Sequence, residues 1–199
     1  MCALDLETTG LDPRRDEIIS FATVPIEGGR IRLADSVYRL VRPERMPEAE
    51  TIRIHGLRPE DLVGAPPIGE VLDELIGAIE ERALVVHVAA VEEGFMRPLL
   101  RGAGTDLDNP IIDTAELWAR RTRERAGRAI SLGALAGELG LPVHRPHEAD
   151  GDALTTAQVF LALATRLDAT EPQTVGSLAR PRRVGPWGAV REGLRRIGR

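Results

Sequence analysis

The chain has 199 residues, enough for one domain with a sizeable hydrophobic core but short for two. Aromatic residues make up only 3% of it, which argues against a protein that binds single strands mainly by base stacking. Cys2 is the single cysteine, so a disulfide within the chain is excluded. The chain lacks both a signal-peptide pattern and an apolar run approaching the roughly 20 residues of a membrane span, so we expect a cytoplasmic protein without a membrane partner.

The net charge of −5 is unevenly distributed along the chain. Residues 171–199 hold seven Arg and two Glu, a net charge of +5, so residues 1–170 carry −10. A basic tail on an acidic body is one way to bind nucleic acid, and a solvated tail without a partner explains the composition equally well. Because the helical periodicity ends near residue 168, we expect a domain at residues 1–168 and a basic, Arg-rich C-terminal tail at residues 169–199.

Apolar segments in the first part of the chain predict strands at residues 3–6, 17–26 and 31–41. The Gly28-Gly29 pair between the last two predicts a hairpin, so we expect an antiparallel meander. Beyond residue 47, short strands alternate with helices, which predicts an α/β fold with a mixed sheet. The expected strands are residues 83–86 and 110–112, the expected helices are residues 48–54, 59–62, 68–79, 90–100, 114–121, 132–139 and 152–167, and charged residues 123–129 are expected to form a loop.

Two carboxylates, Asp5 and Glu7, lie at the end of the first predicted strand. Residues i and i+2 of a strand point to the same face, so both side chains leave an apolar strand together. Their repulsion is costly unless a cation lies between them, and divalent ions with oxygen ligands serve this purpose. Acidic residues are also common where a strand enters a polar turn, so the spacing alone leaves both interpretations open.

Three further residues give weak individual signals. Asp152 begins a long predicted helix, where a carboxylate could either cap the helix or bind a ligand. His147 precedes it on a loop, from which its imidazole could reach a site, although a lone loop histidine often has no such role. Glu92 lies one turn into another predicted helix, beside Glu93, and a solvated helix face explains it equally well.

These residues fall within motifs that resemble those of the DEDDh family of 3′→5′ exonucleases, which includes the proofreading (epsilon) subunit of bacterial DNA polymerase III. Residues 5–10, Asp-Leu-Glu-Thr-Thr-Gly, resemble the first motif, D-x-E-T-T-G. Residues 147–153, His-Glu-Ala-Asp-Gly-Asp-Ala, resemble the third, H-x-A-x-x-D-A. Residues 54–57, Ile-His-Gly-Leu, and 112–114, Ile-Asp-Thr, resemble two shorter family segments, and all the matches follow the family's order.

The second motif departs from the family pattern H-N-x-x-F-D-x-x-F-L. Residues 87–96 read His-Val-Ala-Ala-Val-Glu-Glu-Gly-Phe-Met, so Glu92 stands where the usual Asp stands. Glu keeps the charge and the oxygen ligands of Asp and is longer by a methylene, so the resemblance still implies activity. Val88 replaces the usual Asn and Val91 the usual Phe, which makes the family's substrate contacts near this helix doubtful.

The resemblance implies a ribonuclease H-like fold, a mixed sheet of about five strands flanked by helices, and hydrolysis with two divalent ions, Mg²⁺ or Mn²⁺. In such a site Asp5 would bridge the ions, Glu7 and Asp152 would hold the ion nearer the attacking water, and Glu92 would support the second. His147, whose ordinary pKa is near neutral, would take the proton of the water.

The candidate substrate-binding groups are the backbone of Thr8, Thr9 and Gly10 and the imidazole of His55, for which a structural hydrogen bond is the alternative. We expect the partner to be the single-stranded 3′ end of a nucleic acid, with DNA favoured over RNA, and nucleoside 5′-monophosphates as products. Three alternatives remain: an RNA-trimming exoribonuclease of the same family, a non-catalytic nucleic-acid-binding module, and a Mg²⁺-dependent phosphohydrolase acting on a small nucleotide. The sequence does not indicate whether a polymerase or another protein is a partner.

Overall fold

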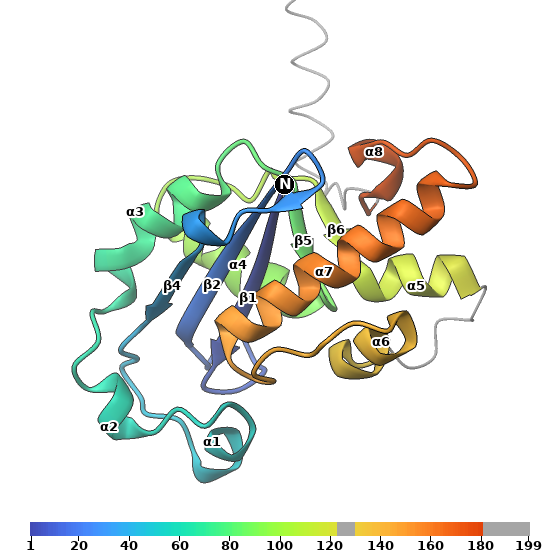
Figure 1. Ribbon diagram of the computed structural model, residues 1–199. Coiled ribbons are helices and arrows are strands. Elements are labelled where there is room, and N and C mark those ends of the chain that lie inside the picture. The colour runs from blue at the N-terminus through green and yellow to red at the C-terminus, as the bar shows by residue number, and fades with distance from the viewer. Residues whose placement is uncertain (123–129, 181–199) are drawn as a thin grey trace, which may run out of the picture.

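The structure is a computed structural model that describes residues 1–122 and 130–180 (Figure 1). The loop expected at residues 123–129 and tail residues 181–199 lie outside this part of the chain. The strands are β1 (Cys2–Thr8), β2 (Ile18–Glu27), β3 (Arg30–Ile31), β4 (Val37–Leu40), β5 (Leu84–Val86) and β6 (Ile111–Asp113). The helices are the 3-10 turn η1 (Leu33–Asp35), α1 (Ala49–His55), α2 (Pro59–Leu62), α3 (Ile68–Ile79), α4 (Ala90–Gly102), α5 (Thr114–Thr122), α6 (Leu132–Leu139), α7 (Ala149–Asp168) and α8 (Val175–Leu178).

The strands form one mixed sheet in the order β3-β2-β1-β5-β6, and β4 also pairs with β2. Pairing is antiparallel between β1 and β2 and from β2 to β3 and β4, and it is parallel from β1 through β5 to β6. Because β3 and β4 pair with different parts of the same edge of β2, the sheet is five strands wide. The predicted meander and the predicted mixed sheet are confirmed.

Helices cover both faces of the sheet, with α7 in front and α4 behind in the view of Figure 1. On the α7 face, Ala3 of β1 joins a core with Val85, Ile112 and the apolar residues of α5, α6 and α7. On the other face, Leu4 and Leu6 join a core with α3 and α4. Since successive residues of a strand alternate between faces, Asp5 and Glu7 share the α7 face with Ala3.

Two elements differ from the sequence-based expectation. The strand expected at residues 31–41 is divided, because η1 interrupts the pairing after Ile31 and β4 resumes it from Val37. Helix α7 begins at Ala149, three residues before Asp152, with Glu148 at its N-cap. Ala149 is buried against the core, which extends the helix beyond the apolar periodicity of the sequence. Asp152 therefore lies in the first turn of α7 and is not its N-cap.

Residues 169–180, expected from the sequence to belong to the tail, contact the domain. Leu178 of α8 is buried in the core on the α7 face. The backbone N–H of Arg180 donates to the carbonyl of Ile111 in β6 at 2.8 Å, and its guanidinium pairs with Glu93 at 2.9 Å and Glu116 at 2.8 Å. A single turn such as α8 is too short to show apolar periodicity. The division after residue 168 stays a prediction, and these contacts join residues 169–180 to the domain.

Val88 adopts the left-handed backbone conformation, with a φ of 63°, between β5 and α4. A β-branched residue is strained in this region, whereas Asn tolerates it well. We expect Val88→Asn to raise the free energy of unfolding by about 1 kcal/mol, as measured by chemical denaturation. Val63→Asn is the control, because Val63 is exposed and has a φ of −60°. An equal gain at Val63 would show that backbone strain at Val88 is not the cause.

Candidate functional site

Three carboxylates meet at the end of β1. Asp5 and Glu7 come from β1 and Asp152 from the first turn of α7, and one ligand oxygen of each lies within 4.8 Å of the other two. Packing of α7 across β1 and β2 brings Asp152 to this point from a distant part of the chain. The carboxyl ends of the parallel strands β1, β5 and β6 meet at the same edge of the sheet, where open α/β sheets commonly place their ligands. The predicted convergence of these three residues is therefore observed in the structure.

The carboxylates are held in an environment that disfavours their charge. Burial raises the pKa of Asp5 well above its usual range, and the charges of Glu92, Glu7 and Asp152 raise it further. Burial also raises the pKa of Glu7 to about 8, and the charge of Asp152 adds to this effect. Carboxylate oxygens are the ligands that divalent cations prefer, and a bound cation relieves this repulsion. The donor set thus fits a divalent metal ion.

Glu92 is a buried acid in the first turn of α4, only 6% exposed, which excludes the solvated helix face as an explanation. Burial raises its pKa to about 8, and its Oε2 atom has no hydrogen-bond partner among the described residues. It acts electrostatically on Asp5 but is not part of the set of three within 4.8 Å. Its neighbour Glu93 instead pairs with Arg97 and Arg180.

His147 lies on the loop before α7 and is exposed at the edge of the acidic cluster. Its backbone N–H donates to the carboxylate of Asp152 at 2.9 Å, and its own φ is 62°. Gly151 allows this loop to pass close to α7, since a Cβ there would lie 2.2 Å from the carbonyl oxygen of His144. Tight packing of the loop backbone on the helix therefore places His147 beside Asp152.

His55 is buried at the end of α1, with 5% of its surface exposed. Its Nδ1 atom accepts the backbone N–H of Leu57 at 3.0 Å, and its Nε2 atom has no partner among the described residues. Burial lowers the pKa of His55, and the charge of His147 lowers it further, so the two imidazoles interact. A neutral His55 that accepts at Nδ1 carries its proton on Nε2. The structural hydrogen bond is present, and one donor remains for a ligand.

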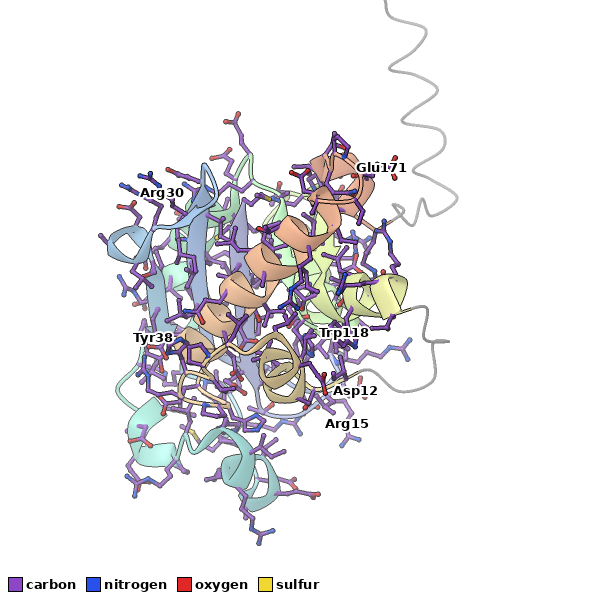
Figure 2. All side chains as sticks on the ribbon, turned by 45° about the vertical axis from the view of Figure 1, so that its right-hand side comes forward. Asp12, Arg15, Arg30, Tyr38, Trp118 and Glu171 are labelled. Carbon is purple, nitrogen blue, oxygen red and sulfur yellow. The ribbon has the colours of Figure 1, made fainter. Side chains whose placement is uncertain are left out.

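Thr8 ends β1, and Thr9 and Gly10 begin the loop that follows it. This loop carries Asp12 and Arg15 near the lower end of the sheet in Figure 2. The hydroxyl of Thr8 donates to the carbonyl of Gly10 at 2.6 Å, and that of Thr9 accepts the N–H of Glu17 at 3.0 Å. A Cβ on Gly10 would lie 2.4 Å from a carboxylate oxygen of Asp16. Close packing against Asp16 thus requires Gly10, and a substrate role for this segment stays a prediction.

Tyr38, labelled in Figure 2, was not singled out from the sequence. The register pairs Asp5 with Ala22 and Ala22 with Tyr38, so Tyr38 shares the sheet face of the acidic cluster. Burial raises the pKa of its hydroxyl, and the charges of Asp150, Glu148 and Glu7 add to this effect, against that of Arg145. The only sequence signal was that Tyr38 is the single tyrosine of the chain.

A family model described as an exonuclease, RNase T, matches residues 2–160 of the chain. The chain belongs to this exonuclease family. The match confirms the resemblance to the DEDDh exonucleases and covers every residue of the acidic cluster.

None of the helices in residues 1–122 and 130–180 has the length and hydrophobicity needed to cross a membrane.

Curated relatives of the chain include DNA polymerase III proteins. It is 39% identical over 159 residues to the DNA polymerase III PolC-type of Thermotoga maritima, and the aligned region covers 79% of this chain and 11% of that protein. It is 37% identical over 178 residues to a DNA polymerase III subunit epsilon-like protein of Rhodobacter capsulatus, and the aligned region covers 87% of this chain and 25% of that protein. The chain thus spans about a quarter or less of the length of these relatives.

Solved structures of exonucleases share the fold. Exonuclease X, in complex with 5′ overhanging duplex DNA, aligns with a TM-score of 0.69 and 24% identity over 89% of this chain and 96% of that one. The nuclease domain of 3′hExo, a DEDDh family member bound to rAMP, aligns with a TM-score of 0.67 and 18% identity over 86% of this chain and 94% of that one. These similarities confirm the predicted ribonuclease H-like fold.

The raised pKa of Glu7 predicts a pH dependence of stability in the absence of metal. The folded protein holds a proton on Glu7 up to a pKa of about 8, whereas the unfolded chain releases it near 4.5. The stability contributed by this group is therefore full below pH 4.5 and is lost as the pH rises to about 8. The side chain of Glu7→Gln stays neutral. In EDTA, the free energy of unfolding of this variant should therefore rise relative to that of the parent as the pH rises across this window, as measured by denaturation.

Divalent metal should make the parent more stable than Glu7→Gln. With Mg²⁺ in excess at pH 8, the parent should gain stability from the bound ion, and Glu7→Gln should gain less because it has lost a ligand. A difference between the two proteins in EDTA that does not change with pH would contradict the raised pKa of Glu7.

Proposed function

We propose that the chain is a metal-dependent 3′→5′ exonuclease of the cytoplasm that hydrolyses phosphodiester bonds at the 3′ end of DNA and releases nucleoside 5′-monophosphates. The observation that carries the proposal is the cluster of Asp5, Glu7 and Asp152, with buried Glu92 beside it, in a chain of the exonuclease family. The roles assigned to these residues form part of the proposal.

The cofactor proposed is a pair of divalent ions, Mg²⁺ or Mn²⁺. Asp5, Glu7 and Asp152 would hold one ion through their clustered oxygens, and Glu92, with its unpartnered Oε2 atom, would serve the second together with Asp5. Two such ions activate a water molecule and stabilise the oxygen that leaves. Soft metal ions fit this donor set less well, because it contains only carboxylates and no sulfur ligand.

His147 is proposed as the general base. Its exposed imidazole lies at the edge of the cluster, and the bond from its N–H to Asp152 ties its backbone to a proposed metal ligand. An ordinary histidine pKa lies near the operating pH, which suits a group that accepts a proton and releases it again. His55 would donate from Nε2 to the terminal nucleotide, and the backbone of Thr8, Thr9 and Gly10 would contact the same nucleotide.

DNA is the proposed substrate because both curated relatives described above are DNA polymerase III proteins. The 3′hExo domain was solved with rAMP, so RNA is the alternative that an experiment has to separate. Digestion of end-labelled single-stranded and double-stranded DNA and RNA, followed by identification of the mononucleotide, distinguishes the two. Release of label from RNA alone would reassign the substrate.

Substitutions at the cluster test the mechanism. Asp5→Ala and Asp152→Asn should each remove nearly all Mg²⁺-dependent activity, because each removes a metal ligand. His147→Ala should lower the rate by about 10²- to 10⁴-fold, the range for a general base. Asp73→Asn, an exposed acid on α3, is the control and should keep the parent rate. Activity that persists in EDTA and in Asp5→Ala would rule the mechanism out.

Glu92 has its own test, since Asp is usual at this position. Glu92→Asp keeps the charge and should retain activity, whereas Glu92→Gln should lose most of it because an amide is a poor ligand for a hard cation. Glu70→Gln, in the exposed first turn of α3, is the matched control. Equal rates for Glu92→Gln and the parent would remove Glu92 from the metal site.

A further inference from the structure

Asp113, at the end of β6, has a buried carboxylate whose two oxygens accept hydrogen bonds from backbone N–H groups. The residue is 5% exposed, and its two oxygens accept four backbone hydrogen bonds. Two come from the N–H groups of Val88 and Ala89, at 3.2 and 2.9 Å, where β5 leads into α4. Two come from Ala115 and Glu116, at 2.9 and 3.3 Å, in the first turn of α5. One side chain therefore binds the starts of two helices.

Helix α4 has no cap from its own sequence. Its N-cap residue is Ala89, whose side chain cannot accept a hydrogen bond. The first N–H groups of a helix need acceptors, which an Asp or Asn at the N-cap often supplies. Asp113, from a different strand, accepts the N–H of the N-cap residue Ala89 itself, and its negative charge suits the positive end of the helix dipole. The position of the start of α4 therefore depends on β6.

The residue next to Asp113 fixes the same junction. The hydroxyl of Thr114 lies 2.8 Å from Nδ1 of His87 and 3.1 Å from the carbonyl oxygen of Val86, which it can bond as a donor. Nε2 of His87 lies 2.9 Å from the carbonyl oxygen of Ile130. These bonds hold the end of β5 against β6, while Asp113 holds Val88 and Ala89, the two residues that lead into the helix that follows.

Glu92 lies three residues beyond Ala89, in that first turn of α4. Its carboxylate is buried and acts electrostatically on Asp5. A shift in the start of α4 would move this carboxylate, and functional groups need to be held within about 0.5 Å of their working position. We infer that Asp113 is a positioning residue that sets the place of Glu92 at the metal site, an inference that rests on the proposed function.

Calorimetric titration with Mn²⁺ tests this role without relying on activity. Asp113→Asn keeps the shape but has one acceptor oxygen, and Asp113→Glu keeps the charge but moves the acceptor atoms. Both should weaken Mn²⁺ binding by about 10- to 100-fold, the range for residues that orient metal ligands. In a Glu92→Gln background the same changes should alter binding of the remaining ion less than about twofold, because coupled residues are not additive.

Ser131→Ala is the matched control. It removes the bond from the N–H of Ala134 at the N-cap of α6 and should cost about 1 kcal/mol of stability without changing Mn²⁺ binding. Circular dichroism and denaturation establish that each variant is folded, and Asp113→Asn carries the test if Asp113→Glu does not fold.

The outcomes separate this inference from the proposed function. Parent-like Mn²⁺ binding in a folded Asp113 variant would overturn the positioning role and leave the proposed function intact. An equal loss with and without Glu92 would do the same, because Asp113 would then act by another route. A parent protein that binds no Mn²⁺ would overturn the proposed metal site, and the positioning role with it.

Discussion

Repulsion among carboxylates at the end of β1 is the constraint on which the rest of the structure depends. Asp5, Glu7 and Asp152 lie within ligand distance of one another, and burial raises the pKa of each. The apolar cores on the two faces of the sheet offset this cost, because packing of α7 and α4 against the strands carries their acidic residues to one place. A divalent ion reverses the sign of the interaction, so the arrangement that destabilises the metal-free protein is the one that favours binding.

The cluster is held largely through backbone packing and buried hydrogen bonds. Gly10 and Gly151 stand where a Cβ would collide with Asp16 or with the carbonyl of His144, so both loops can lie tightly beside the acids. Asp113 bonds four N–H groups and joins the starts of α4 and α5. These contacts fix the backbone of the segments that carry the acids, although the charge of Asp113 adds to the effects that raise the pKa of Glu92.

The departures from the family pattern are confined to the junction of β5 and α4. Val88 has a left-handed backbone, and this gives a conformational reason for the Asn that is usual there. Glu92 is buried with an unpartnered oxygen, so the longer side chain still points into the protein and acts on Asp5. Three side chains of this motif, Val88, Val91 and Glu92, thus differ from the family pattern, and Glu92 is still buried beside the acidic cluster.

The sequence by itself determined the helices and strands and the residues that are able to bind metal or transfer protons. Apolar periodicity predicted α3 with the bounds that it has, and the i, i+2 spacing placed Asp5 and Glu7 on one face. Only the tertiary structure decided that Glu92 is buried, that Tyr38 shares the face of Asp5, and that Asp113 binds the backbone at the start of α4 from another strand. Periodicity and propensity report on neighbours within a few residues, whereas burial and strand register arise from segments that are distant in the chain. The motifs therefore identified the acids, and packing determined which of them act on one another.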